Sequence, residues 1–369
     1  MKITFPHMGN THIGIKCLFD ELGVETVIPP KISKKTLEIG TKYAPELICL
    51  PLKITLGNYI ESIERGADTI VVTGSCGPCR YGYYSEVQKE ILKDLGHKVE
   101  MVVLDAPQGD IPEFLRRVHK ISNTKNPFKI GKSLKNAAKV LKKLNDFEGH
   151  VLQLRPHEAV KGDFDQTYKQ LIRDLEKSNG AKEMLAYIET AFNRIKNIPQ
   201  KRKEDVLKVG IVGEIYTVIE DAANVDIGKK LNDMGVEVYK SHSASEWLTE
   251  NLFYRSVGLT SEKKIEEASD PYMKTLIGGH AKETIGHTVL YAERGFDGVI
   301  QVLPFTCMPE IVSMSILPKV QQDHHIPVLS LIIDELTGEA GYLTRIEAYI
   351  DLLRNRRENK KDEKMLSRH

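Results

Sequence analysis

The feature that most constrains the fold is a strand–helix alternation that occurs twice along the chain. Near the N-terminus, short β-branched runs such as KITF and DTIVVTG alternate with amphipathic stretches, and HKVEMVVLD closes this first series. The alternation restarts at VLKVGIVG and continues through FDGVIQVLPF and IPVLSLIID. Strands that are separated by helices pair in parallel, and the helices cover the sheet. The sequence therefore predicts an α/β fold with two parallel-sheet lobes.

A helical segment separates the two series, because there the strand signal disappears and apolar residues recur at helical spacing. We predict an N-terminal α/β lobe over 1–110, a helical segment over 111–203, a C-terminal α/β lobe over 204–353 and a polar tail over 354–369. The early helical part, from Arg116 to Lys143, is rich in Lys and Arg and contains no Asp or Glu. Two interpretations are open for it, a solvated helix face and a phosphate-binding patch.

Composition excludes several classes of protein. The chain has 52 basic and 51 acidic residues, so no global field favours nucleic acid or a membrane surface as a partner. The start, MKITFPHMGN, lacks the features of a signal peptide, and no stretch approaches the roughly 18 apolar residues of a membrane span. We expect a cytoplasmic protein. Five cysteines in 369 residues are too few for a disulfide scaffold and are more typical of metal ligands or catalytic thiols.

Four of the cysteines share one local context. Cys49 ends the run ELIC, Cys76 and Cys79 follow DTIVVTGS, and Cys307 follows GVIQVLPFT, so each is predicted at or just past the carboxyl end of a strand. Ligands bind at this edge of open parallel sheets. We therefore expect the four thiols to converge between the lobes on a metal cluster. Cys17 lies inside the predicted helix GIKCLFDEL, where a buried structural thiol is the favoured interpretation.

The cysteine pattern leaves other kinds of site open. Four thiolates also suit structural zinc, although zinc sites more often use two close Cys pairs than single cysteines from distant strands. A thioredoxin-like dithiol would use the CGPC loop and leave Cys49 and Cys307 without a role. An iron–sulfur cluster uses all four thiols. The CGPC loop leads into a predicted helix whose free N–H groups can stabilise thiolate and sulfide.

Charged residues near these segments are further candidates. Glu214 directly follows the strand KVGIVG, so it is a candidate to relay a proton or orient a ligand, or to cap the next helix. Glu310 follows Cys307 by three residues and is predicted either to point toward the site or to interact with a helix N-terminus. Lys53 and Arg80 follow candidate ligands and would offset the negative charge of a cluster, or form surface ion pairs.

The segments ICLPLK, GSCGPCRYGYY, VGEIY, PFTCMPE and DELTGEAGYLTRIEAYID resemble the D-component-type proteins of the 2-hydroxyacyl-CoA dehydratase superfamily. More narrowly, the chain is similar to stand-alone proteins related to the acyl-CoA dehydratase activase. The resemblance runs from the first strand to about Leu353. It implies Rossmann-like lobes around a [4Fe–4S] cluster or a double-cubane relative, with Cys49, Cys76, Cys79 and Cys307 at the ligand positions.

The resemblance also implies partners and a reaction class. A separate ATP-hydrolysing activator, which carries its own cluster, would deliver low-potential electrons to an anaerobic redox system, and the substrate would be an acyl-CoA thioester or another small molecule. The chain would then be a dehydratase-like lyase or a component of an ATP-dependent reductase, as a homodimer or heterodimer. It is not expected to be the activator, because it lacks GxxxxGK[ST]. A non-catalytic cluster carrier and a zinc-stabilised binding protein remain as alternatives.

Overall fold

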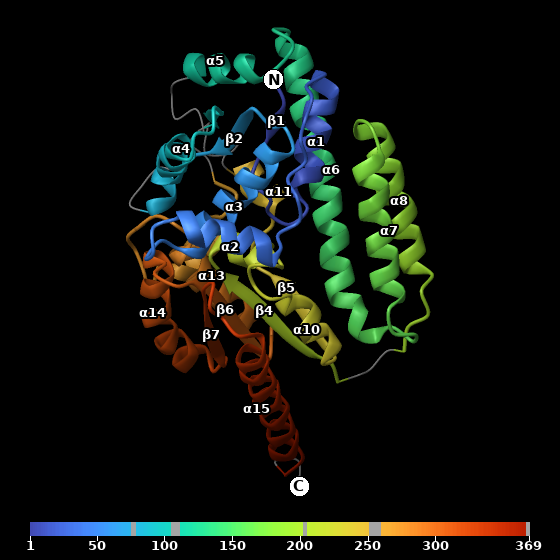
Figure 1. The fold of residues 1–369 in the computed structure, drawn as a ribbon. Coiled ribbons are helices and arrows are strands. Elements are labelled where there is room, and N and C mark those ends of the chain that lie inside the picture. Colours follow the sequence, from blue (N-terminus) through green and yellow to red (C-terminus); the bar gives the residue numbers. More distant parts are fainter. Residues whose placement is uncertain (75–78, 105–110, 202–204, 251–259, 367–369) are drawn as a thin grey trace. The chain divides into compact units, whose positions relative to one another are not determined.

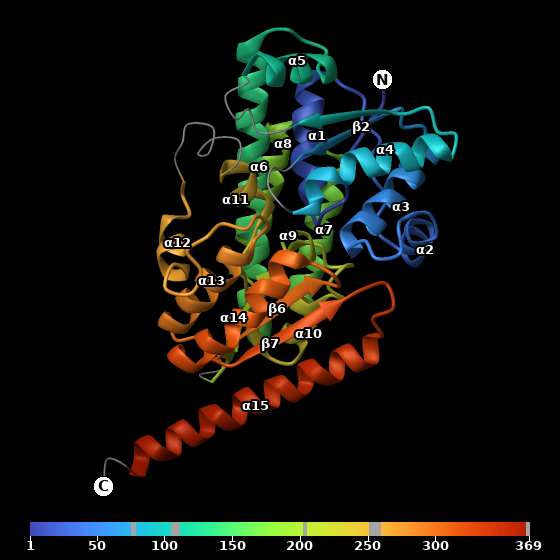
Figure 2. The ribbon, with the colours of Figure 1, turned by 90° about the vertical axis from the view of Figure 1, so that its left-hand side faces the viewer.

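The chain forms two compact units. Figures 1 and 2 show the helices and strands in sequence colours. The computed structural model describes residues 1–74, 79–104, 111–201, 205–250 and 260–366. Unit 1 comprises Met1–Val151, Glu158–Pro199 and His242–Glu262, and unit 2 comprises Leu152–His157, Gln200–Ser241 and Lys263–His369. Within these described residues each unit contains one sheet, so the prediction of two α/β lobes with parallel sheets is confirmed.

The sheet of unit 1 has the order β1-β2-β3, and all its strands are parallel. Its strands are β1 (Ile3–Thr4), β2 (Thr69–Thr73) and β3 (Glu100–Leu104). The connecting helices are α1 (Thr11–Leu22), α2 (Lys34–Tyr43), α3 (Leu50–Glu64) and α4 (Tyr84–Asp94), the last preceded by the 3₁₀ turn η1 (Arg80–Tyr83). Val71 packs with α1 on one face, whereas Ile70 and Val72 pack with α3 and α4 on the other. This alternation explains why β2 reads as a continuous apolar run.

Two glycines allow α2 and α3 to pack against each other at close range. A Cβ atom on Gly40 would lie 1.8 Å from the carbonyl oxygen of Lys53, and one on Gly57 would lie 2.0 Å from that of Thr36. Both distances are far below van der Waals contact, so only glycine fits at either position. The contact fixes the position of α3, whose first residue directly follows Cys49.

The other elements that the structure describes in unit 1 are helices, and most of them lie in the segment 111–203 that the sequence predicts to be helical. They are α5 (Ile111–Ile121), α6 (Pro127–Leu154), α7 (Asp163–Lys177), α8 (Ala181–Lys196) and α11 (Ala244–Thr249). Figures 1 and 2 show α6 running beside α7 and α8. The ring of Phe147 on α6 stacks with Tyr168 on α7, with 6.4 Å between centroids, and meets Phe192 on α8 edge-on at 5.2 Å.

The sheet of unit 2 has the order β5-β4-β6-β7, and all its strands are parallel. Its strands are β4 (Leu207–Gly213), β5 (Val236–Lys240), β6 (Gly298–Pro304) and β7 (Val328–Ile333). Its helices are α9 (Ile215–Ile219), α10 (Ile227–Asp233), α12 (Lys263–Ser269), α13 (Ala281–Glu293), α14 (Met308–His324) and α15 (Glu339–Leu366), and η2 (Arg155–His157) is a 3₁₀ turn. Every residue of β6 is buried, as expected of a central strand.

Helix α15 continues to Leu366 and includes the polar residues from Arg354 onward. These residues are mostly Arg, Lys and Glu, which are good helix formers. Among the helices of the described residues, none is long and apolar enough to cross a membrane.

Candidate functional site

Three candidate ligand cysteines directly precede helices. Cys49 is the N-cap of α3, and Cys307 is the N-cap of α14. Cys79 is the N-cap of η1, and η1 leads into α4. All three have extended backbones, with φ of −69°, −65° and −72° and ψ of 151°, 130° and 102°, respectively. The N–H groups of a first helical turn have no partner within their helix, so they stabilise negative charge on a nearby thiolate.

The segments around Cys49 and Cys307 are alike. In each, a proline stands two residues after the cysteine, Pro51 in α3 and Pro309 in α14. Proline suits the first helical turn because its missing N–H is not needed there. Cys-x-Pro therefore begins one helix in each unit, which is a closer correspondence than the shared strand–helix rhythm suggests.

One part of the sequence prediction for Cys49 is wrong. Residues 46–49, the run ELIC, form a turn and not a strand. The run is short and lies between Pro45 and Pro51, and a few apolar residues carry no periodicity that separates a strand from a turn. Cys79 does lie in the loop after β2, and Cys307 follows β6 after Phe305 and Thr306. Cys76 is outside the described residues.

The segment that follows Cys79 packs on the segment that contains Cys49. The hydroxyl of Tyr84 contacts the Sγ atom of Cys49, and Arg80 donates a hydrogen bond of 3.4 Å to the carbonyl of Leu47. Tyr81 lies edge-on to Tyr84, with 5.4 Å between centroids. Within unit 1, the structure therefore brings together the segments that carry two of the predicted ligands.

The two cations singled out in the sequence lie close to these segments. Lys53 is only 2% exposed, and its Nζ atom donates a hydrogen bond of 2.9 Å to the carbonyl of Glu46. Lys53 also lies one helical turn after Cys49 in α3. Arg80, by contrast, is exposed. The buried cation therefore belongs to the Cys49 segment, where desolvation strengthens its effect on nearby charge.

Cys307 is 8% exposed and follows a residue with an unfavourable backbone conformation. Thr306 has φ of 66°, in the left-handed region that β-branched residues rarely adopt. The surrounding structure has to hold such a residue in place, and conformations of this kind are frequent at functional sites.

Glu310 forms the centre of a buried polar network in unit 2. Its carboxylate accepts hydrogen bonds from Thr284 at 3.0 Å, from Gln301 at 2.9 Å and from Ser313 at 3.0 Å. The side chain is fully buried. Burial raises the pKa of Glu310 to about 7, the three hydrogen bonds oppose this rise, and the charge of Glu214 adds to it. The structure shows the carboxyl held inside unit 2 by side chains of α13, β6 and α14. Its predicted orientation toward the site stays a prediction.

Glu214 caps a helix. Its carboxylate accepts hydrogen bonds from the backbone N–H groups of Tyr216 and Thr217, each at 3.0 Å, at the start of α9. The preceding Gly213 has φ of 132°, and a Cβ atom there would lie 1.9 Å from the carbonyl oxygen of Val302. The end of β4 therefore requires glycine. The capping interpretation of Glu214 is confirmed, and its role toward a ligand stays a prediction.

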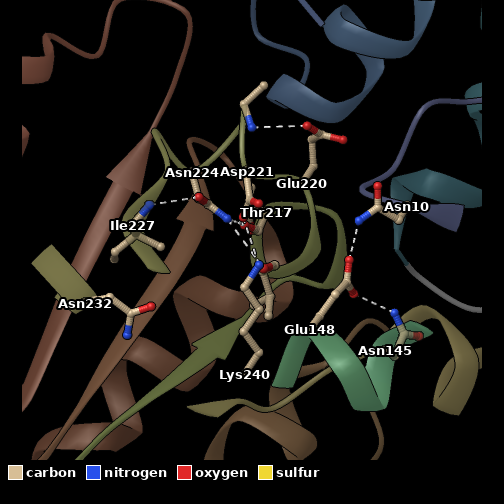
Figure 3. A network of polar contacts seen from close by, with 12 residues as sticks. Asn10, Asn145, Glu148, Thr217, Glu220, Asp221, Asn224, Ile227, Asn232 and Lys240 are labelled. Carbon is tan, nitrogen blue, oxygen red and sulfur yellow. Dashed lines mark hydrogen bonds and ion pairs between the residues drawn. The ribbon is translucent and has the colours of Figure 1, made fainter. Parts of the chain in front are cut away.

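The loop after α9 is also held in an unusual conformation. Val225 and Asp226 both have left-handed backbones, with φ of 59° and 54°. Asn224 supports the loop, since its side chain donates to the carbonyl of Thr217 at 2.7 Å and accepts from the N–H of Ile227 at 3.2 Å (Figure 3). These bonds order the segment that follows Glu214.

Cys17 lies in α1 and is fully buried, as the sequence predicts. Burial, and after it the charges of Glu21 and Asp20, raises the pKa of its thiol to about 12. The thiol is therefore neutral at physiological pH and is not suited to bind a metal as a thiolate.

A histidine pair in unit 1 was not predicted from the sequence. His7 and His12 are both buried, and their rings stack with 5.5 Å between centroids. The Nε2 atom of His12 lies 3.7 Å from Glu176 on α7, and a hydrogen bond from His12 is the main cause that lowers the pKa of that carboxyl. The signal for His7 was present, because it follows β1 as the cysteines follow later strands.

The loop between His7 and His12 is tied to α6 by a second polar network. Asn10 donates to Glu148, which also accepts a hydrogen bond of 2.8 Å from Asn145 (Figure 3). Glu148 accepts another of 2.9 Å from Tyr168. These bonds hold the loop after β1 against the helical part of unit 1.

The donor set fits an iron–sulfur cluster in its chemistry. Thiolates are the usual ligands of such clusters, and the described cysteines at helix starts are placed where thiolate is stabilised. Among the described residues, no group of three or more His, Cys, Asp or Glu side chains is gathered closely enough to hold a metal ion. The predicted set includes Cys76, which is not among those residues.

Residues 7–75 match a family model described as the CoA enzyme activase uncharacterised domain. The match begins at His7, includes Cys49 and ends just before Cys76. It agrees with the resemblance to activase-related proteins over this part of unit 1. A comparison with curated proteins gave no match.

Proposed function

We propose that this protein binds an iron–sulfur cluster through Cys49, Cys76, Cys79 and Cys307 and acts as a redox component of the 2-hydroxyacyl-CoA dehydratase type. The observation that carries the proposal is the placement of the three described cysteines, each directly before a helix on an extended backbone. The Cys-x-Pro start of α3 and α14 gives each unit one such position.

The residues around Cys49 support a ligand role. The hydroxyl of Tyr84 contacts its sulfur and would donate a hydrogen bond to a thiolate, which lowers the charge that the sulfur carries. The buried ammonium of Lys53 offsets further negative charge. A bound cluster would supply one-electron transfer.

A proton and substrate role is proposed for Glu214. It lies at the end of β4, and β4 pairs with β6, the strand that precedes Cys307. Its oxygens accept capping hydrogen bonds, but each carboxylate oxygen has a second lone pair for a ligand. In this proposal Glu214 orients a substrate or relays its proton at the carboxyl edge of the sheet.

The electron donor and the substrate follow from the resemblance. We propose that a separate ATP-hydrolysing activator with its own cluster delivers electrons, and that the substrate is an acyl-CoA thioester or another small molecule. The match of residues 7–75 to an activase-related family supports this context. The cluster is either a [4Fe–4S] cluster or a double-cubane relative.

Anaerobic purification, followed by iron and acid-labile sulfide analysis and an absorption spectrum, tests the proposal. The wild-type protein should contain iron and sulfide in nearly equal amounts and absorb broadly in the visible range. Replacement of Cys49, Cys79 or Cys307 by alanine should remove most of the iron. Cys17→Ala is the matched control, since it removes a thiol from the core of unit 1, and it should retain iron.

Three results would contradict the proposal. The first is a protein without iron, and the second is an iron content that is unchanged in Cys307→Ala. The third is zinc in place of iron, which would favour a zinc-stabilised binding protein. Transfer of an intact cluster to an apo-protein, without reduction of any acyl-CoA, would favour the carrier function over the redox enzyme.

A further inference from the structure

Helix α6 presents a row of exposed lysines along one face. These residues, which we call the lysine stripe, are Lys129, Lys132, Lys135, Lys139, Lys142 and Lys143. They recur mainly at intervals of three and four residues, so they share one side of the helix. At a rise of 1.5 Å per residue the stripe is about 20 Å long.

The positive charge of the stripe is largely uncompensated. Lys142 lies 3.4 Å from Asp146, and it is the one member with an ion pair among the residues that the structure describes. The stripe also falls in the part of the sequence, from Arg116 to Lys143, that contains no acidic residue. Because the whole chain has a net charge of only +1, this is a local concentration of charge and not a consequence of composition.

The opposite face of α6 is anchored in unit 1. Val140, Leu141, Leu144 and Phe147 are almost fully buried. Leu141 packs on Gly14 of α1, and a Cβ atom added to Gly14 would lie only 3.2 Å from the Cβ atom of Leu141. Phe147 packs on α7 and α8. The lysine stripe is therefore held on a rigid support and faces solvent, and the apolar side of the helix is not available to enter a membrane.

From this arrangement we propose that the lysine stripe is the docking surface for an acidic protein that donates electrons. Lysines on a convex helix face suit a carboxylate-rich protein surface, because each ammonium is a point charge that tolerates many partner geometries. Nucleic-acid sites more often use arginine forks and several stacking aromatic rings, and the stripe has neither. Weak, salt-sensitive docking of this kind is typical of electron-transfer partners.

The inference rests on the proposed function for the role of the partner as an electron donor. The test uses a fluorescently labelled plant-type ferredoxin as a small acidic one-electron carrier and measures binding by anisotropy. A triple variant, Lys132→Glu, Lys135→Glu and Lys139→Glu, reverses the centre of the stripe. The control is a second triple variant that changes the net charge by the same amount at exposed positions of α7 and α8, namely Lys169→Glu, Lys182→Glu and Lys196→Glu. Circular dichroism checks that both variants fold.

The wild type should bind ferredoxin at about 50 mM salt and lose at least about tenfold in affinity at about 300 mM, because exposed charges are screened. The stripe variant should bind ferredoxin at least about tenfold more weakly at low salt, since each charge reversal replaces an attraction by a repulsion. The control variant should bind it less than about threefold more weakly. Equal losses in the two variants, or no binding by the wild type, would overturn the proposal. So would equal or tighter binding of duplex DNA or of phosphatidylglycerol vesicles through the stripe.

Failure of this proposal is separable from failure of the proposed function. The anisotropy measurement does not require a cluster in this protein, whereas the proposed function requires iron and sulfide. An iron-free protein whose stripe binds ferredoxin would refute the cluster alone. An iron–sulfur protein whose stripe variant binds as the wild type does would refute the docking surface alone.

Discussion

Replacement of Glu310 by glutamine should remove a pH-dependent loss of stability. The carboxyl is fully buried, and its pKa is about 7 in the folded protein against 4.5 for the ordinary group. Below about pH 4.5 it is protonated in both the folded and the unfolded chain. As pH rises toward 7 the unfolded chain releases the proton first, so the free energy of unfolding falls.

The magnitude follows from the two pKa values. Each pH unit between them corresponds to about 1.4 kcal/mol, so the folded protein should lose about 3 kcal/mol between pH 4 and pH 8 through this group. Glu310→Gln keeps the size of the side chain and has no proton to lose. The difference in unfolding free energy between variant and wild type should therefore grow by about 3 kcal/mol over this range.

Urea denaturation of both proteins at several pH values from 4 to 8 measures this difference, and the other titrating groups cancel in it. Thr284→Val provides a matched variant, because it removes one hydrogen bond that lowers the pKa of Glu310 and leaves the carboxyl in place. It should make the loss of stability with pH larger. A difference between Glu310→Gln and wild type that stays constant across the range would refute the reasoning.

Three further predictions concern backbone and thiol positions. Gly57→Ala should destabilise unit 1 by about 2–3 kcal/mol in urea denaturation, because the added Cβ atom clashes with α2. Gly131→Ala in α6, where a Cβ atom has no neighbour within 4 Å, should stabilise unit 1 by about 0.5–1 kcal/mol. Equal effects of the two substitutions would contradict this prediction. Thr306→Gly should leave stability unchanged or raise it by up to about 1 kcal/mol, because the left-handed backbone favours glycine. Thr344→Gly inside α15 should lower stability. A loss of stability in both variants would argue against backbone strain before Cys307. Cys17 should resist iodoacetamide in the native protein and react with it in urea, because the thiol is buried. Mass spectrometry measures the labelling, and fast labelling of the native protein would show that Cys17 is not buried.

The sequence was sufficient to predict the strands of both sheets. Runs such as DTIVVTG and GVIQVLPF are apolar on both faces, and this pattern is typical of buried parallel strands. The helical segment was equally clear from its periodicity. The failure at ELIC has a local cause, because a short run between prolines forms a turn and leads into the helix that begins at Leu50.

The candidate site was only partly predictable. The position of Cys307 after β6 and of Cys79 after β2 could be predicted from the sequence, since each lies between its strand and the next helix. The contact between His12 and Glu176 joins segments far apart in the sequence, so no local pattern specifies it. That Glu214 caps a helix also required the structure, because a carboxylate after a strand suits both a cap and a ligand.

The central proposal is that Cys49, Cys76, Cys79 and Cys307 bind an iron–sulfur cluster, and Mössbauer spectroscopy of protein enriched in ⁵⁷Fe tests it most directly. The wild-type spectrum should show thiolate-ligated cluster iron, and Cys307→Ala should lose that signal or change the environment of part of the iron. Cys17→Ala should give the wild-type spectrum. The absence of cluster iron from the wild type, or identical spectra for wild type and Cys307→Ala, would contradict the claim.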